Sequence, residues 1–389
     1  MSTSADSSAF TRAFSRLNGR FPWRRVGSRD QLVVAWSGQM FVYVLARWRA
    51  DGVHEVVRCG VERQGSDSMG AFISRLQNLR LKCSAVHVML WAEQYQLLQI
   101  DAPGVAPEEM RAAARYQIRE LLHSHVDDAT LDVMRVGDSR QTGGGQIFVV
   151  AVPNVVLRDV IALCDAVQWN INVIDIQETA QRNLQSALAK IDGYPERANA
   201  ALILVDGHAA VLTICANDEL FFSRRLESPE DLLATYKGPD HNATGPPAAV
   251  APVAAAGEKY LPVGEYVPDY RVGGVAYGSD YSNLPVAVSA PLNVNSAIDE
   301  KMRRFVTEVD RSIDTWSRSW SSLPLHEIRV HIAGRTNDLC AWLSTHLAHK
   351  VTPLAVGTLF PGFERAAGND AELCLPLLGV LLRTETPKA

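Results

Sequence analysis

The sequence has no apolar run long enough to span a membrane. A helix that crosses a bilayer needs roughly 20 apolar residues in a row, and no stretch approaches that length. The first 30 residues also lack the apolar core of a secretory signal. Six cysteines are scattered and none forms a Cys-x-x-Cys pair, so neither a zinc site nor a disulfide framework is indicated. Together these absences predict a cytoplasmic protein.

An excess of positive charge is also missing. The 389 residues carry a formal net charge of -5, whereas dedicated nucleic-acid-binding proteins usually present a basic surface. We therefore expect no nucleic-acid partner.

The sequence contains neither a P-loop nor a Gly-x-Ser-x-Gly motif, which removes two common signatures of phosphate and ester chemistry. A chain of this length suits two lobes better than one small core.

A pattern of three short apolar segments joined by turns occurs twice. The first copy runs from Gln31 to Glu62 and the second from Ala200 to Leu226. Turn pairs such as Ser37-Gly38 and Asp206-Gly207 separate the segments, so each copy predicts a three-stranded meander. Two meanders that begin about 170 residues apart indicate an internal duplication and two related lobes.

Residues from about 84 to 176 predict a small α/β subdomain inserted in the first lobe. Strand-like and helix-like segments alternate there in the order β-β-α-β-β-α-β. The clearest helix runs from Pro107 to His123, because proline suits the first turn and Glu108 and Glu109 suit the positive end of the helix dipole. Its apolar stripe, which we predict to be buried, consists of Met110, Ala114, Ile118 and Leu121.

The opposite face of this helix carries three arginines, Arg111, Arg115 and Arg119. We interpret them as the basic rim of a groove between the subdomain and the first lobe. Such a groove would bind a short extended peptide. For any single arginine, an ordinary solvated helix face is the simpler interpretation.

The remaining segments complete a division into two lobes. Residues 1–30 are rich in serine and arginine and predict a flexible basic tail, residues 31–192 the first lobe, and residues 193–389 the second. An Ala/Pro/Gly-rich stretch at about 237–291 predicts a flexible insertion in the second lobe, because it has too little apolar surface to bury. Further helices are predicted at Asn154–Val167, Gln177–Ile191, Asn295–Trp320 and the final CLPLLGVLLR.

Four local stretches, taken in their order along the chain, carry a resemblance to a known family. They are VIDIQETAQRNL, VDGHAAVLTICANDELFFSRRL, EVDRSIDTWSR and LLGVLLR. Each is similar to a segment of the PilM/MshI-type pilus assembly proteins of the actin-like ATPase superfamily. The cell-division protein FtsA and the cytoplasmic domain of the type II secretion L protein are also similar. The resemblance implies an α/β, two-lobed actin-like (ASKHA) fold with a small α/β subdomain inserted in the first lobe.

The same resemblance implies a function. The chain would be a cytoplasmic scaffold of a type IV, MSHA-like pilus assembly machine, peripherally associated with the inner membrane. Its partner would be the N-terminal segment of a PilN-like inner-membrane protein, beside other subunits of the machine. Two alternatives stay open, an active actin-like ATPase of pilus assembly and an FtsA-like division protein.

The resemblance also implies a nucleotide site, at which this sequence departs from the pattern. Actin-like sites have an Asp-x-Gly turn in each meander, where the Asp acts through the metal ion and the Gly lets backbone N–H groups approach phosphates. Here Ala35 and Ser37 stand where the first Asp and Gly should be, and His208 replaces the second Gly. Without the first Asp, the metal handling that phosphoryl transfer needs is missing.

We therefore predict that the chain is not an enzyme and has no catalytic residues, no metal site and no required cofactor. Weak binding of ATP and Mg²⁺ is left open. It would use the vestigial nucleotide site, formed by Ser37, Gly38, Asp206, Gly207 and Gly334.

Overall fold

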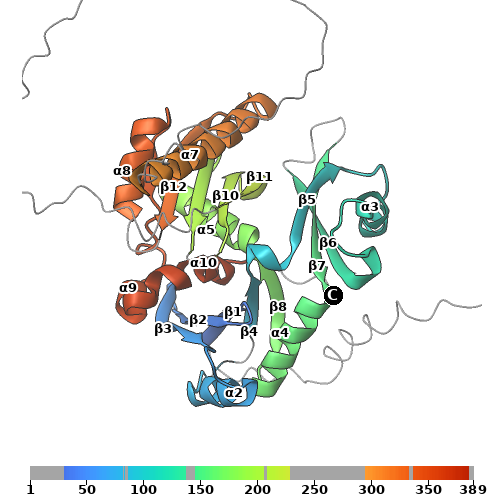
Figure 1. Cartoon of the computed structure of the whole chain (residues 1–389), viewed down its shortest axis with the longest axis vertical. Helices are drawn as coiled ribbons and strands as arrows, with labels where there is room; N and C mark the ends of the chain where they lie inside the picture. Colours follow the sequence, from blue (N-terminus) through green and yellow to red (C-terminus); the bar gives the residue numbers. More distant parts are fainter. Residues whose placement is uncertain are drawn as a thin grey trace, which may run out of the picture.

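The computed structural model describes residues 30–81, 83, 86–136, 145–205, 208–227, 294–332 and 336–384. These residues form two lobes, each built on a five-stranded sheet, and a small three-stranded sheet beside them (Figure 1). The α/β class and the two-lobed architecture predicted from the sequence are confirmed. The predicted tail, apart from Asp30, and the predicted insertion at 237–291 lie outside the described residues.

The first lobe is built on a sheet with strand order β3-β2-β1-β4-β8. Its antiparallel meander and two added parallel strands are β1 (Asp30–Trp36), β2 (Met40–Trp48), β3 (His54–Arg63), β4 (Val86–Leu90) and β8 (Ile171–Ile176). One face is covered by α2 (Met69–Asn78) and α4 (Asn154–Val167). Ser68 precedes helix α2, and its hydroxyl accepts a hydrogen bond from the Ala71 N–H and so caps the helix.

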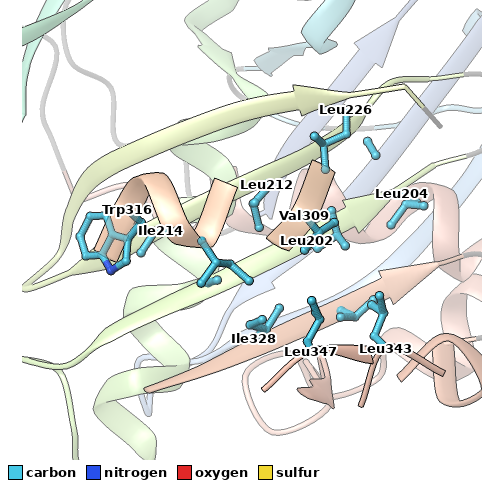
Figure 2. Packing of buried hydrophobic residues seen from close by; sticks show 14 of the residues in the cluster. Leu202, Leu204, Leu212, Ile214, Leu226, Val309, Trp316, Ile328, Leu343 and Leu347 are labelled. Atoms are coloured by element: carbon cyan, nitrogen blue, oxygen red, sulfur yellow. The ribbon is translucent and has the colours of Figure 1, made fainter. Parts of the chain in front are cut away.

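The second lobe repeats this plan with strand order β11-β10-β9-β12-β13. Its strands are β9 (Ala198–Leu204), β10 (Ala210–Ala216), β11 (Glu219–Leu226), β12 (Leu325–Ile332) and β13 (Val351–Pro353). The apolar stripe of α7 (Val294–Ser319) packs on one face together with α8 (Thr336–His346). Figure 2 shows Leu202 and Leu212 of the sheet beside Val309 of α7, with Trp316 and Leu343 at either side of the cluster.

The inserted subdomain is smaller than the predicted range of 84–176. Its sheet has the order β5-β7-β6, formed by β5 (Gln96–Asp101), β6 (Ala129–Val136) and β7 (Gln146–Pro153). Helix α3 (Met110–Ile118) covers one face. The first and last strands of the predicted unit, β4 and β8, instead pair with each other in the first-lobe sheet. The prediction was wrong because sequence order does not reveal which sheet a strand joins.

Two helices form the layer between the lobes. Helix α5 (Gln177–Ile191) packs on the second-lobe sheet, and α10 (Ala371–Leu381), preceded by α9 (Phe363–Ala367), packs on the first. The assignment of all of residues 193–389 to the second lobe was therefore wrong, since α9 and α10 complete the first. The helices cross at Gly379, where a side-chain Cβ would lie 1.8 Å from the Ala180 carbonyl oxygen, so only glycine permits this approach.

Candidate functional site

The turn of the first meander is an ordinary tight hairpin. The Ser37 N–H donates to the Met40 carbonyl over 3.1 Å. Gly38 adopts a φ of +88°, in the left-handed region that glycine tolerates. Ala35, at the position of the missing Asp, is fully buried in β1. Its methyl group offers no oxygen to a metal ion or to metal-bound water.

The turn of the second meander is described from His208 onward. Three predicted cofactor-binding residues, Asp206, Gly207 and Gly334, lie outside the described residues. The His208 side chain is only 6% exposed. Its ring stacks on Trp91, with ring centroids 4.1 Å apart and 15° between the planes. At the position where the resemblance implies a glycine, this chain thus fills the space beside the turn with an imidazole.

A short segment, Trp91 to Gln94, contacts the turns of both meanders. Glu93 accepts a hydrogen bond from His208 Nδ1 over 3.1 Å and another from the Ala209 N–H. Gln94 Nε2 donates to the Trp36 carbonyl over 2.9 Å, and its Oε1 accepts from the Trp91 N–H over 2.9 Å. We call this segment the bridging turn, because it joins the two places where the sequence predicts nucleotide-binding turns.

The charge of Glu93 is stabilised by these hydrogen bonds. Burial acts to raise the pKa of Glu93, but the hydrogen bonds from His208 and Ala209 outweigh it and hold the pKa below its ordinary value. The carboxylate is therefore ionised near neutral pH. It places a negative charge beside His208 and Ala209, the described part of the second turn.

A metal site has no support in the part of the chain that the structure describes. No group of three or more His, Cys, Asp or Glu side chains is arranged to hold a metal ion among those residues. The helices in the described ranges also include none that is both long and apolar enough to cross a membrane.

The predicted vestigial nucleotide site has only two described residues, Ser37 and Gly38, because its other three members lie outside the described ranges. It stays a prediction.

The three arginines predicted to bind a partner are all ion-paired. Arg111 pairs with Asp132 at 3.0 Å, Arg115 with Asp127 at 2.6 Å, and Arg119 with Glu120 at 3.7 Å. Helix α3 is also shorter than the predicted Pro107–His123, and Leu121, predicted to be buried, is 54% exposed beyond its end. The basic rim is therefore largely neutralised. It lies on a helix that packs on the small sheet rather than on the first lobe.

A groove beside the subdomain opens instead toward the second lobe. A hollow of about 330 Å³ lies between β5 and β11, and its lining includes Gln96–Gln99, Phe148 and Ser223–Arg225. Both β5 and β11 are edge strands among the described strands of their sheets. An edge strand carries backbone N–H and C=O groups that can pair with an added strand. The groove thus combines apolar walls, which include Leu97 and Phe148, with backbone groups suited to an extended peptide.

A polar cluster around the buried Glu178 contributes to the lining of this groove. Glu178, at the start of α5, is fully buried and accepts a hydrogen bond from the Tyr95 hydroxyl. Arg225 of β11 lies 3.3 Å from Glu178 and donates to the Tyr95 carbonyl over 2.8 Å. Burial, followed by the charge of Glu178, raises the pKa of Tyr95 well above its ordinary value. The cluster joins the subdomain, the central helix and the second lobe at one point.

Sequence reasoning missed the bridging turn and this cluster. The sequence predicts Trp91 as the end of one strand and Gln94 as the start of the next, with only Ala92 and Glu93 between them. Glu178 lies in the first turn of the predicted helix Gln177–Ile191. A glutamate at such a place is usually a solvated residue near the positive end of the helix dipole. The remaining signal was the adjacent Arg224 and Arg225 at the end of a predicted strand. Neither arginine could be paired with a carboxylate before the fold was known.

No protein-family model matches the chain, and no curated protein matches it. Among solved structures, the chain is similar to the PilM-PilN type IV pilus biogenesis complex, with 13% identity and a TM-score of 0.60. The match covers 92% of this chain and 100% of that chain. The cytoplasmic domain of EpsL, an inner-membrane component of the type II secretion system of Vibrio cholerae, matches 54% of this chain and 76% of its own, with 17% identity and a TM-score of 0.37.

The match over nearly the whole chain defines the fold. Both lobes, the inserted subdomain and the central helix pair belong to one two-lobed actin-like arrangement that also occurs in PilM. The resemblance to PilM and the actin-like fold predicted from the sequence are confirmed.

Proposed function

We propose that the chain is a scaffold protein of a type IV pilus assembly machine that binds a PilN-like inner-membrane protein and does not turn over ATP. The proposal includes two finer expectations. The pilus is of the MSHA-like type, and the chain lies in the cytoplasm, where its partner holds it at the inner membrane. The observation that carries it is the fold shared with PilM over 92% of the chain, in a structure named for its complex with PilN.

Support for a scaffold without ATP turnover comes from the two turns. Ala35 offers no ligand for a metal ion, and the first turn is a plain hairpin. Phosphoryl transfer depends on a metal ion that neutralises charge on the phosphates. At the second turn, Glu93 places a carboxylate that would repel a phosphate group. We expect the purified protein to release no phosphate from Mg-ATP, whereas micromolar ATP affinity with steady phosphate release would contradict this part of the proposal.

Support for a peptide partner comes from the groove between β5 and β11. Leu97 and Phe148 give it apolar walls, and the two edge strands offer backbone groups. A short extended segment binds such sites by adding a strand, with alternate side chains in pockets. This location replaces the α3 face as the proposed binding site, because Arg111, Arg115 and Arg119 already pair with acidic neighbours.

The test is a titration with a peptide from the cytoplasmic N-terminal segment of the PilN-like protein encoded nearest this gene. Ser223→Trp should weaken binding at least about tenfold, because an indole would occupy much of a groove of about 330 Å³. The matched control is a triple variant on α3, Arg111→Ala, Arg115→Ala and Arg119→Ala, which should bind as the wild type does. The reverse result would return the site to the α3 face. No binding by the wild type would remove the proposed partner.

A further inference from the structure

The bridging turn makes three contacts from one lobe to the other at a single place. It continues directly from β4 in the first-lobe sheet, whereas His208 and Ala209 lead into β10 of the second. The contacts are the ring stack of Trp91 on His208, the hydrogen bond from His208 Nδ1 to Glu93, and the hydrogen bond from the Ala209 N–H to Glu93. A stack and two charge-assisted hydrogen bonds at one point make a specific link between lobes.

The chemistry of this link is that of an anion held by a turn. Backbone N–H groups in turns commonly bind phosphate or carboxylate oxygens. Here one carboxylate oxygen of Glu93 takes the Ala209 N–H and the other takes the His208 ring hydrogen. The anion is supplied by the chain itself. No separate ligand is needed to satisfy the described donors of this turn.

The carboxylate is held in place before it meets the second lobe. Trp91, two residues earlier, is fully buried. Gln94, the next residue, is fixed on both sides by its hydrogen bonds to Trp36 and Trp91. Little backbone freedom of this segment remains to be lost when the Glu93 side chain meets the turn, which favours the contact.

We infer that the bridging turn is a built-in ligand that holds the two lobes in their observed arrangement without a nucleotide. Glu93 occupies the anion position of the second turn, and His208, in place of a glycine, serves as its second donor and as the stacking partner of Trp91. This inference concerns the lobes alone. It stands whether or not the partner is a PilN-like protein, and its test measures neither peptide binding nor ATP hydrolysis.

The test is hydrogen exchange of the full chain, followed by mass spectrometry on a peptide that contains Ala209 beyond its first two residues. In Glu93→Ala the Ala209 amide loses its acceptor, so it should exchange about tenfold or more faster than in the wild type. Glu93→Gln keeps an oxygen acceptor but loses the charge, so its exchange should fall between the two. Glu120→Ala, which removes an exposed carboxylate of the subdomain, is the matched control and should exchange as the wild type does.

Two results would overturn the inference. One is unchanged exchange at Ala209 in both Glu93 variants, since the carboxylate would then hold nothing. The other is a slowing of exchange at both turns when Mg-ATP is added to the wild type, because the lobes would then depend on nucleotide. Slow exchange in the centre of β10 confirms that a variant is folded. If Glu93→Ala fails this check, the comparison of Glu93→Gln with the wild type decides.

Discussion

At the scale of single residues, Gly379 determines how closely the two central helices approach. A Cβ at this position would lie 1.8 Å from the Ala180 carbonyl oxygen, which belongs to the backbone of α5 and has little room to move. The Asn183 side chain also donates to the Gly379 carbonyl over 3.0 Å. Close packing of two backbones is the reason for a glycine here, since the helix itself would be better served by alanine.

Gly379→Ala should therefore lower the free energy of unfolding by about 3 kcal/mol, the cost of forcing extra volume into a packed contact. The measurement is chemical denaturation followed by circular dichroism. Gly70→Ala is the matched control, because Gly70 lies in helix α2 with no heavy atom within 4 Å of its added Cβ. That variant should be as stable as the wild type or slightly more stable. Equal stability of the two variants would contradict the close crossing.

His331 is a second residue whose role follows from the layer between the lobes. Pro376 lies inside α10 and has no N–H to give to the Glu372 carbonyl one turn earlier. His331 Nε2 lies 3.2 Å from that carbonyl, and since a carbonyl only accepts, Nε2 carries the hydrogen. A buried histidine of the second-lobe sheet thus replaces a missing hydrogen bond in a helix of the first lobe.

Stability should fall in acid partly through His331. Burial lowers the pKa of His331 from 6.5 to about 4. The unfolded chain therefore binds a proton that the folded chain rejects between these values. The contribution is fully present above pH 6.5 and is lost as the pH falls toward 4, by up to about 1.4 kcal/mol for each pH unit.

The variant His331→Gln should reduce the slope of unfolding free energy against pH over this range, because glutamine can still donate to Glu372 but does not titrate. His346→Gln, on the exposed face of α8, serves as the control and should keep the wild-type slope. An unchanged slope in His331→Gln would mean that this histidine is solvated or already protonated in the folded chain.

At the scale of elements, three of them meet at the buried carboxylate of Glu178. Tyr95 precedes β5, Glu178 lies in the first turn of α5, and Arg225 lies in β11. The Arg225 guanidinium also lies over the Tyr95 ring, 4.6 Å from its centroid. A buried charge needs such partners, and removing one of them leaves the others poorly satisfied.

Tyr95→Phe should destabilise the protein by about 1–3 kcal/mol, because the ring remains but Glu178 loses a hydrogen bond in a buried site. Tyr116→Phe is the control, since Tyr116 lies 77% exposed on α3; it should change stability by less than about 0.5 kcal/mol. Thermal and chemical denaturation measure both. A Tyr95→Phe variant as stable as the wild type would show that Arg225 alone satisfies Glu178.

Most elements could be predicted because each carries its own apolar period. Helices α4 and α5 have the bounds that the sequence predicts, and the predicted helix at Asn295–Trp320 corresponds to α7, whose Trp316 is buried in the second-lobe core. The predicted role of the α3 arginines was less accurate, because Arg115 and Arg111 pair with Asp127 and Asp132, which lie beyond the helix. Periodicity shows which face of an element is buried, but not the neighbour that buries it.

At the scale of the whole molecule, the packing of α9 and α10 on the first-lobe sheet could not be predicted, because periodicity does not name the sheet that buries a helix. The sequence CLPLLGVLLR predicts an apolar helix, but either sheet could bury it. The bridging turn and the groove between β5 and β11 both form between segments far apart in sequence. The candidate site was therefore predicted only at its two turns, and the groove predicted between the subdomain and the first lobe differs from the groove now proposed between β5 and β11.

The most direct test of the account is to map where a PilN-like segment attaches. The N-terminal peptide, carrying a photoreactive side chain, is cross-linked to the full chain, and the modified residues are identified by mass spectrometry. The account predicts cross-links at Gln96–Gln99 and Ser223–Arg225, which line the groove, and their loss in Ser223→Trp. Cross-links confined to Tyr116 and Arg119 on the outer face of α3, or none that unlabelled peptide can compete away, would contradict it.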